Sequence, residues 1–241
     1  MRLVEGIVPE RMSWAVAIAG LIGLLVPAHG NEAGTTSPAS ILLFGSLEAS
    51  PSVFVTTGAK VALDRIDREG FVVLGSVGGG RRQEATVMRE TAIGAVVVGY
   101  QWFPDWGVVA AYAGPEGALE VVSSGCGCAH VLPPRFGLRL HGEIWARPSD
   151  ETLLAATLIL GTARTSAWGR VAWGYRVLGA YLGPETSLYL DETGYQKWNF
   201  GLHATDFALG RFSLRVSAGL QLASERRDTS PYVGLTVWTP W

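Results

Sequence analysis

The sequence predicts an all-β fold: a single transmembrane antiparallel β-barrel of about twelve strands, since bacterial barrels have even strand numbers. Three observations predict it. The composition is apolar, with 48% hydrophobic and only 17% charged residues, against about 25% charged in a typical soluble protein. Beyond the N-terminus, no apolar run reaches the roughly 18 residues of a helical membrane span. Apolar and polar residues instead alternate along many segments, as in strands with one face toward lipid.

The first thirty residues have the features of a secretory signal peptide. An apolar stretch from Trp14 to Val26 is followed by small residues at Ala28 and Gly30. Its length fits the core of a signal peptide, and a membrane anchor is the alternative. We therefore expect a signal peptide at 1–30, a flexible periplasmic lead at 31–40 and an outer-membrane barrel at 41–241.

From Ile41 onward the periodicity predicts strands and no amphipathic helix. It is clearest from Phe212 to Leu222, where every second residue is apolar and the residues between are Ser, Arg, Gly or Gln. The predicted strands are 41–49, 52–63, 70–81, 88–101, 106–122, 135–147, 152–163, 167–177, 180–190, 195–205, 210–223 and 231–239.

The predicted connections alternate in length. Short ones lie at 104–105, 148–150, 178–179 and 208–210, and longer, more polar ones lie near 82–87, 123–134, 191–194 and 224–230. Outer-membrane barrels have short periplasmic turns and longer external loops. The pattern therefore predicts the outer membrane of a Gram-negative bacterium, with both termini in the periplasm.

The last predicted strand supplies a further signal. Its apolar residues share a face with Trp241, and a terminal aromatic after alternating apolar residues is typical of outer-membrane barrels. We expect this strand to close the barrel against the first strand, near Ile41–Ala49.

The longest predicted external loop contains the two cysteines of the chain, Cys126 and Cys128. A CxC pair lacks the other ligands of a zinc site, and a disulfide between these residues would be strained. We expect a loop feature without a catalytic role. No cluster of residues has metal-ligand spacing, no cofactor motif is present, and a net charge of −2 does not favour nucleic-acid binding.

A short internal repeat predicts charge inside the barrel. The sequence Tyr-Ala-Gly-Pro-Glu ending at Glu116 recurs as Tyr-Leu-Gly-Pro-Glu ending at Glu185. The alternation directs Glu185 into the lumen, where a buried carboxylate needs partners. Either the resulting network fills and rigidifies a narrow barrel, or it forms a polar path or ligand site with glycan contacts. The predicted members are Glu116, Arg139, His141, Glu143, Trp145, Arg170, Arg176, Glu185, Lys197, His203, Arg211 and Arg215.

No catalytic residue is assigned by the sequence, and we expect no enzyme. His141 and His203 are candidate bases, but there is no GxSxG motif. Asp206 is expected on the opposite face of the strand from His203, so the two side chains would not meet. The first alternative is a lipid- or lipopolysaccharide-modifying enzyme, which requires a Ser or Asp within hydrogen-bond reach of a histidine. The second is a purely structural or adhesive barrel with a plugged lumen.

Several segments carry a resemblance to a known family: Asp67–Phe71, Gly99–Trp102, Trp145–Pro148, Trp173–Arg176, Ala180–Glu185, Thr193–Trp198, His203–Gly219 and Ser230–Leu235. They resemble the cellulose biosynthesis protein BcsS family, over nearly the whole mature chain. The resemblance implies an accessory role in bacterial cellulose (exopolysaccharide) biosynthesis and secretion, either in polymer passage or in surface anchoring. The implied partners are outer-membrane lipid and lipopolysaccharide, the cellulose chain, and cellulose-synthase or export components. No catalytic residues are carried over.

Overall fold

A computed structural model gives the fold, and it describes residues 39–84, 87–124, 128–224 and 228–241. The signal peptide expected at 1–30 lies outside the described residues, as does the expected periplasmic lead except for residues 39 and 40. Among the described residues, no helix is long and apolar enough to cross a membrane.

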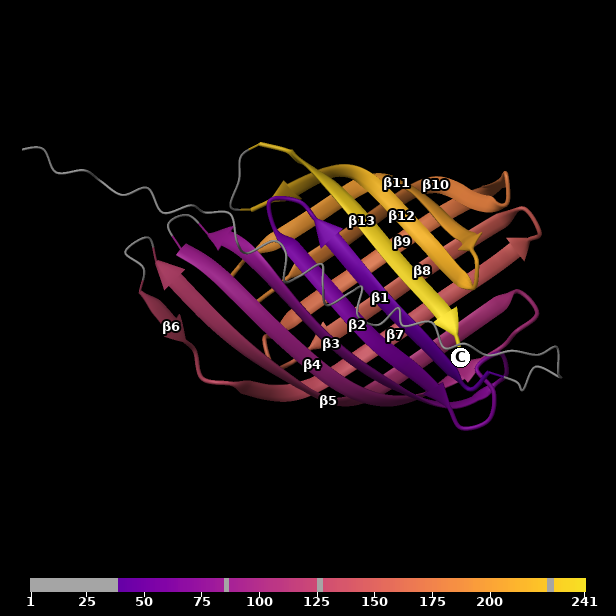
Figure 1. Ribbon diagram of the computed structural model, residues 1–241, viewed down its shortest axis with the longest axis horizontal. Helices are drawn as coiled ribbons and strands as arrows, with labels where there is room; N and C mark the ends of the chain where they lie inside the picture. Colours follow the sequence, from indigo (N-terminus) through magenta and orange to yellow (C-terminus); the bar gives the residue numbers. More distant parts are fainter. Residues whose placement is uncertain (1–38, 85–86, 125–127, 225–227) are drawn as a thin grey trace, which may run out of the picture. The chain divides into compact units, whose positions relative to one another are not determined.

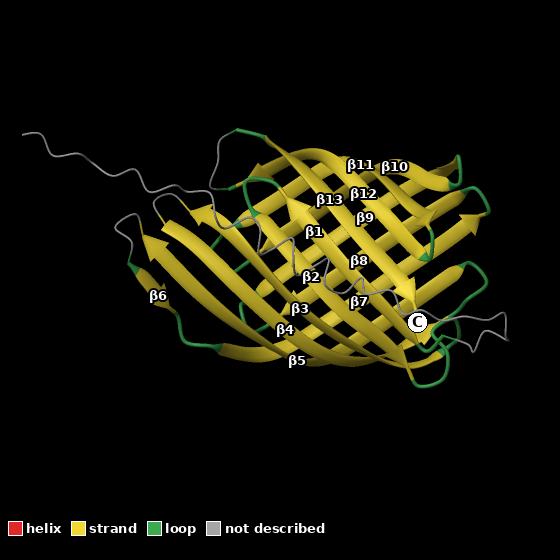
Figure 2. Cartoon of the chain, viewed as in Figure 1, coloured by secondary structure: helices red, strands yellow, loops and turns green. Residues whose placement is uncertain are grey.

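The described chain is a closed antiparallel barrel (Figures 1 and 2). Along the chain each strand of the ring pairs with the next one, β5 with β7, and β1 pairs with β13 to close the ring. The short β6 pairs only with β5 and stays outside the ring. The prediction of an all-β barrel of about twelve strands is therefore confirmed, since all thirteen strands except β6 form the ring. The strands are β1 (Ile41–Ala49), β2 (Val53–Ala62), β3 (Gly70–Glu84), β4 (Val87–Trp102), β5 (Gly107–Ser124), β6 (Ala129–Val131), β7 (Arg135–Ser149), β8 (Thr152–Gly161), β9 (Ser166–Val177), β10 (Ala180–Leu190), β11 (Gln196–Leu209), β12 (Phe212–Ala223) and β13 (Ser230–Pro240).

The closing pair fixes which strand ends lie together. The register runs from Leu42 opposite Pro240 to Ala49 opposite Val233, and the Trp241 amide donates to the Ile41 carbonyl at 2.7 Å. The start of β1 and the end of β13 thus share one end of the barrel, here called the terminal end. The carboxyl terminus marks it in Figure 1, and β6 lies at the other end, here called the opposite end.

Most turns at the terminal end are tight. The turns after β9 and β11 contain backbone in the left-handed region, at Leu178 (φ 51°), Gly179 (φ 85°) and Gly210 (φ 61°), where glycine has no steric penalty. The exception is the connection 63–69. It folds toward the lumen, where Gln101 Nε2 donates to the carbonyls of Ile66 at 3.0 Å and Arg68 at 2.7 Å.

The connection expected near 82–87 is shorter than predicted. Pairing of β3 with β4 continues to Glu84 opposite Val87, so residues 82–84, which were predicted as part of the connection, are strand. Arg82 and Glu84 of β3 and Arg89 of β4 are held there by ion pairs.

The strand alternation gives the barrel two different faces. Many large apolar side chains point outward and are exposed, among them Val98 (54%), Leu138 (62%) and Leu202 (67%). Buried apolar residues form a cluster of β2 to β5 toward the terminal end that includes Val72, Leu74, Val97 and Tyr112. Elsewhere the inward surface combines apolar side chains, such as Trp168, with many charged and polar ones.

Candidate functional site

The barrel encloses a cavity of about 700 Å³ lined by side chains from most of the strands. Because successive residues of a strand face opposite sides, one parity of each strand supplies this lining. Most of the predicted network lies here: Glu116, Arg139, His141, Glu143, Trp145, Arg170, Glu185, Lys197 and Arg215.

Three predicted members lie elsewhere. His203 faces inward but is only 2% exposed, with Nδ1 2.7 Å from Thr205 Oγ1 and Nε2 3.1 Å from the Trp173 carbonyl. Arg176 has inward parity, but it lies near the end of β9 and is exposed. Arg211 lies in the turn after β11, exposed, with its guanidinium 5.3 Å from the ring centroid of Trp241. Arg176 and Arg211 thus lie near the barrel ends and outside the cavity lining, because parity does not reveal how close a residue lies to the barrel end.

Two ion pairs lie in the lumen around β7. Lys60 on β2 pairs with Glu143, and His141 Nε2 lies 3.2 Å from the other oxygen of that carboxylate. Arg139 Nε donates to Glu116 at 3.0 Å, and the Ala163 amide donates to the second Glu116 oxygen at 3.0 Å. Each carboxylate therefore has a cationic partner and a second polar contact.

A second group of polar residues lies on β10 to β13 and β1. Glu185 pairs with Arg215 and accepts a hydrogen bond from the Tyr232 hydroxyl at 2.9 Å. Glu48 pairs with Lys197 and accepts from Asn199 Nδ2 at 3.3 Å. Glu185, Arg215 and Asn199 are at most 8% exposed.

Glu48 and Lys60 were not in the predicted network, although the sequence carries a signal for both. Each is the only charged residue of its strand, in β1 and β2 respectively. A charge in the middle of a lipid-facing barrel strand is expected to point inward, so these two residues belonged in the predicted network.

Charged side chains also meet across the opposite end of the lumen. We call Arg82, Arg89, Arg164, Glu84, Glu120 and Asp191 the opposite-end network. Arg82 Nη1 lies 2.9 Å from Asp191 Oδ2, although the two residues are 109 positions apart. Arg164, from the turn after β8, lies 2.7 Å from Glu120 and 3.3 Å from Asp191. Strands of two different walls are thereby connected.

Asp191 follows β10 and is held as a carboxylate by this network. Burial alone would raise its pKa, but hydrogen bonds from Thr193 and the charges of Arg82 and Arg164 outweigh burial, so the pKa lies below its ordinary value. The Thr193 amide donates to Asp191 Oδ1 at 3.0 Å.

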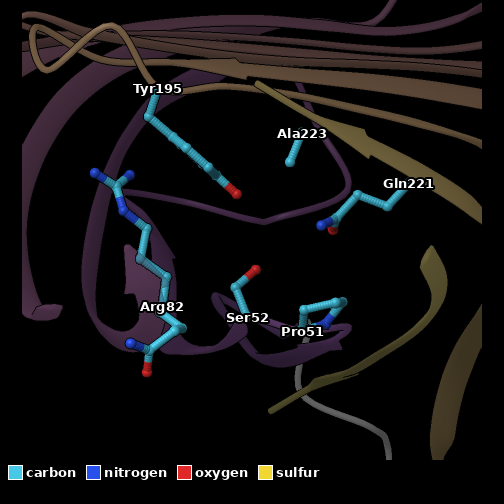
Figure 3. A pocket seen from close by; sticks show the side chains of 7 residues that line it. Pro51, Ser52, Arg82, Tyr195, Gln221 and Ala223 are labelled. Atoms are coloured by element: carbon cyan, nitrogen blue, oxygen red, sulfur yellow. The ribbon is translucent and has the colours of Figure 1, made fainter. Parts of the chain in front are cut away.

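A small pocket lies beside the opposite-end network (Figure 3). The Arg82 guanidinium stacks 4.0 Å from the Tyr195 ring centroid, and Ser52 and Gln221 face the same space in Figure 3. Its volume of about 10 Å³ suits one water molecule and no sugar. The large lumenal cavity is therefore the candidate site.

The arrangement that the enzyme alternative requires is absent from the described part of the chain. There, neither His141 nor His203 has a Ser or Asp at hydrogen-bond distance. The hydroxyl beside His203 belongs to Thr205, which is 0% exposed and inaccessible to a substrate. The described residues also contain no group of three or more His, Cys, Asp or Glu arranged to hold a metal.

The cysteine loop is described only in part. Cys126 lies outside the described residues, and Cys128 is exposed, with its carbonyl accepting from the Ser124 amide at 3.0 Å. The lumen lining does not include Cys128.

Comparison with known sequences identifies one family. A family model described as "Cellulose biosynthesis protein BcsS" matches residues 42–241, which span the whole barrel. No curated protein sequence matches the chain significantly.

Solved structures with similar folds are outer-membrane barrels. The KdgM porin shares 13% identity with a TM-score of 0.43, over 83% of this chain and 99% of its own. The translocator domain of the autotransporter NalP from Neisseria meningitidis shares 11% identity with a TM-score of 0.48, over 94% of this chain and 97% of its own. Omp33 from Acinetobacter baumannii shares 10% identity with a TM-score of 0.43, over 84% and 98%. This likeness carries no argument about function.

Proposed function

Because the chain belongs to the family of the cellulose biosynthesis protein BcsS, we propose that it is an accessory outer-membrane protein of bacterial cellulose biosynthesis and secretion. The observation that carries the proposal is the family match, which covers the entire barrel, residues 42–241. Membership associates the chain with cellulose biosynthesis, and the more specific role rests on the barrel itself.

The outer face supports a place in a membrane. Exposed Val, Leu and Phe side chains surround the barrel, and transmembrane barrels carry an apolar outer band of this kind. In our proposal the terminal end faces the periplasm. The opposite end, where β6 and the cysteine loop lie, then faces the exterior and would meet the secreted polymer.

The lumen offers chemistry that suits a glucan. Trp145 and Trp238 line the cavity with their ring centroids 6.0 Å apart, and aromatic faces pack against apolar surfaces while leaving polar groups to hydrogen-bond nearby. The charged pairs around Glu143 and Glu185 supply donors and acceptors for hydroxyl groups. We propose that Trp145 and its polar neighbours contact the glucan chain.

Deleting the gene in a cellulose-producing strain tests the proposal. We expect less secreted cellulose, restored by the wild-type gene but not fully by Trp145→Ala. Trp173→Ala is the matched control, since Trp173 is also on a barrel strand but is 46% exposed on the outer face. Immunoblots of outer membranes would verify equal amounts of each variant. Unchanged cellulose secretion in the deletion strain would overturn the proposal.

The opposite-end network favours a second candidate, a scaffold through which no polymer passes. The contacts of Asp191 with Arg82 and Arg164 bridge the lumen. A scaffold predicts negligible ion conductance in planar bilayers for the wild type and for Asp191→Asn alike. A conduit predicts conductance that rises when this bridge is removed.

A further inference from the structure

The lumenal charges pair off with one exception. Four basic side chains of the cavity lining each have a carboxylate partner inside the barrel: Lys60 with Glu143, Arg139 with Glu116, Lys197 with Glu48, and Arg215 with Glu185. Arg170, on β9, also lines the cavity. Among the described residues, no carboxylate oxygen lies within 4.0 Å of it, so one positive charge is left without its own partner.

Two of the three guanidinium nitrogens of Arg215 have no hydrogen-bond partner among the described residues. Its Nη2 is held by Glu185, which is fixed in turn by the Tyr232 hydroxyl. Its Nε and Nη1, and the Nε of Arg170, are buried without a hydrogen-bond partner among the described residues. The two guanidinium groups are close enough to interact electrostatically, and Glu185 acts on both. Glu48 and Glu143 also act on Arg170, but they pair with Lys197 and Lys60. Glu185 is therefore the one of these three carboxylates that has no lysine partner, and the two arginines share it.

Such an arrangement is unfavourable unless a further negative charge is supplied. A buried cation without a partner carries a large desolvation cost. Arginine presents a rigid fork of donors that fits the two oxygens of a carboxylate or phosphate. The missing element is thus an oxyanion that accepts from both guanidinium groups.

We propose that the lumen between β9 and β12 is a binding site for a sugar that carries an oxyanion, either a carboxylate or a phosphate. Arg170 and Arg215 bind the anionic group. Trp168 lies next to Arg170, with 5.7 Å between the guanidinium carbon and the ring centroid, and both line the cavity. Its ring offers an apolar face to the sugar, and the cavity of about 700 Å³ has room for a small saccharide. This inference goes beyond the proposed function, since cellulose itself is uncharged.

Calorimetric titration of the purified barrel in a non-ionic detergent at low ionic strength tests the proposal. The probes are glucuronate for the carboxylate, glucose 6-phosphate for the phosphate, and glucose as the neutral reference. We expect at least one acid to bind tenfold or more tightly than glucose, because hydrogen bonds to an ionised acceptor are stronger than hydrogen bonds to a neutral hydroxyl. The acid that binds more tightly identifies the group. If both acids bind no more tightly than glucose, or if neither acid binds, the proposal is overturned.

Variants of β9 locate the site. Arg170→Gln should weaken acid binding about tenfold or more, while Arg170→Lys, which keeps the charge but loses the fork, should lose less. Arg176→Gln is the matched control, because Arg176 is on the same strand with the same parity but is exposed near the barrel end. Arg170→Gln should fold at least as well as the wild type, since it removes an unpaired buried charge. Wild-type acid binding by a folded Arg170→Gln barrel would refute the site.

Discussion

At the scale of single residues, Glu185 is the carboxylate on which the charge balance of the lumen depends. It is 8% exposed and pairs with Arg215, which is 2% exposed. Replacing Glu185 by Gln leaves two buried guanidinium groups without a counter-charge. We expect a loss of about 3–5 kcal/mol in the free energy of unfolding, as for other broken buried pairs, measured by urea titration of the refolded barrel with tryptophan fluorescence.

The control for Glu185 is an ion pair that is more exposed to solvent. Asp206 lies 2.9 Å from Arg147, whose side chain is 49% exposed. Asp206→Asn should cost no more than about 1 kcal/mol, since exposed pairs contribute little. Equal losses in the two variants would show that Glu185 is not electrostatically critical.

Gly201 is a residue at which the absence of a side chain matters. A Cβ added there would lie 2.3 Å from the Ala218 carbonyl oxygen and 2.5 Å from the Tyr232 hydroxyl. Gly201 thus leaves room for Tyr232 to reach Glu185. Gly201→Ala should destabilise the barrel by about 1–3 kcal/mol through overpacking, measured by the same urea titration.

Gly142 provides the comparison for Gly201. It also lies within a strand, but a Cβ added there meets no atom within 4 Å. Gly142→Ala should leave the free energy of unfolding unchanged or slightly raised, because alanine lowers the entropy of the unfolded chain. A similar loss in both variants would mean that backbone flexibility, and not contact with Tyr232, is the cause.

At the scale of elements, the connection after β10 anchors the opposite end through Asp191. The folded-state pKa of Asp191 is lowered, by Thr193, Arg82 and Arg164 against the effect of burial. Its stabilising contribution is therefore fully present above the ordinary Asp pKa of about 3.9 and is lost as the pH falls through the lower folded-state value. Asp191→Asn should be less stable than the wild type at pH 7, and the difference should shrink below about pH 4.

Urea titrations of both proteins between pH 3 and pH 7 would check this. The exposed Asp105, in a turn at the terminal end, is the control, and Asp105→Asn should change stability little at any pH. A difference between Asp191→Asn and the wild type that stays constant with pH would contradict the assignment.

The elements themselves show where sequence periodicity succeeds and fails. Residues 212–222 were predicted as a strand because lipid and lumen impose a strict two-residue period. Residues 82–84 were assigned to a connection, because Arg82, Gln83 and Glu84 carry no apolar period. The strand β3 continues through them because ion pairs of Arg82 and Glu84 with residues of β4 and the connection after β10 replace the missing apolar contacts.

At the scale of the whole molecule, the barrel topology followed from counting strands, but the partners inside the lumen did not. Antiparallel neighbours and closure of the last strand on the first are fixed by chain order. Pairs such as Lys60 with Glu143, or Arg82 with Asp191, join residues 83 and 109 positions apart. Such pairs depend on the tilt and stagger of the strands, which no local pattern encodes. The alternation therefore predicted which side chains face inward and could not predict their partners.

The membrane placement of the whole barrel makes a prediction of its own. Leu202 is 67% exposed midway along β11, opposite Pro184 and Ala218 of its neighbours. Val131 is 59% exposed on β6, outside the closed ring. If lipid surrounds the ring, Leu202→Arg should cost about 2–4 kcal/mol in lipid vesicles, as charges do near the bilayer midplane, while Val131→Arg should cost little. Urea titration of vesicle-embedded protein measures both, and equal costs would show that the apolar face around Leu202 does not meet lipid.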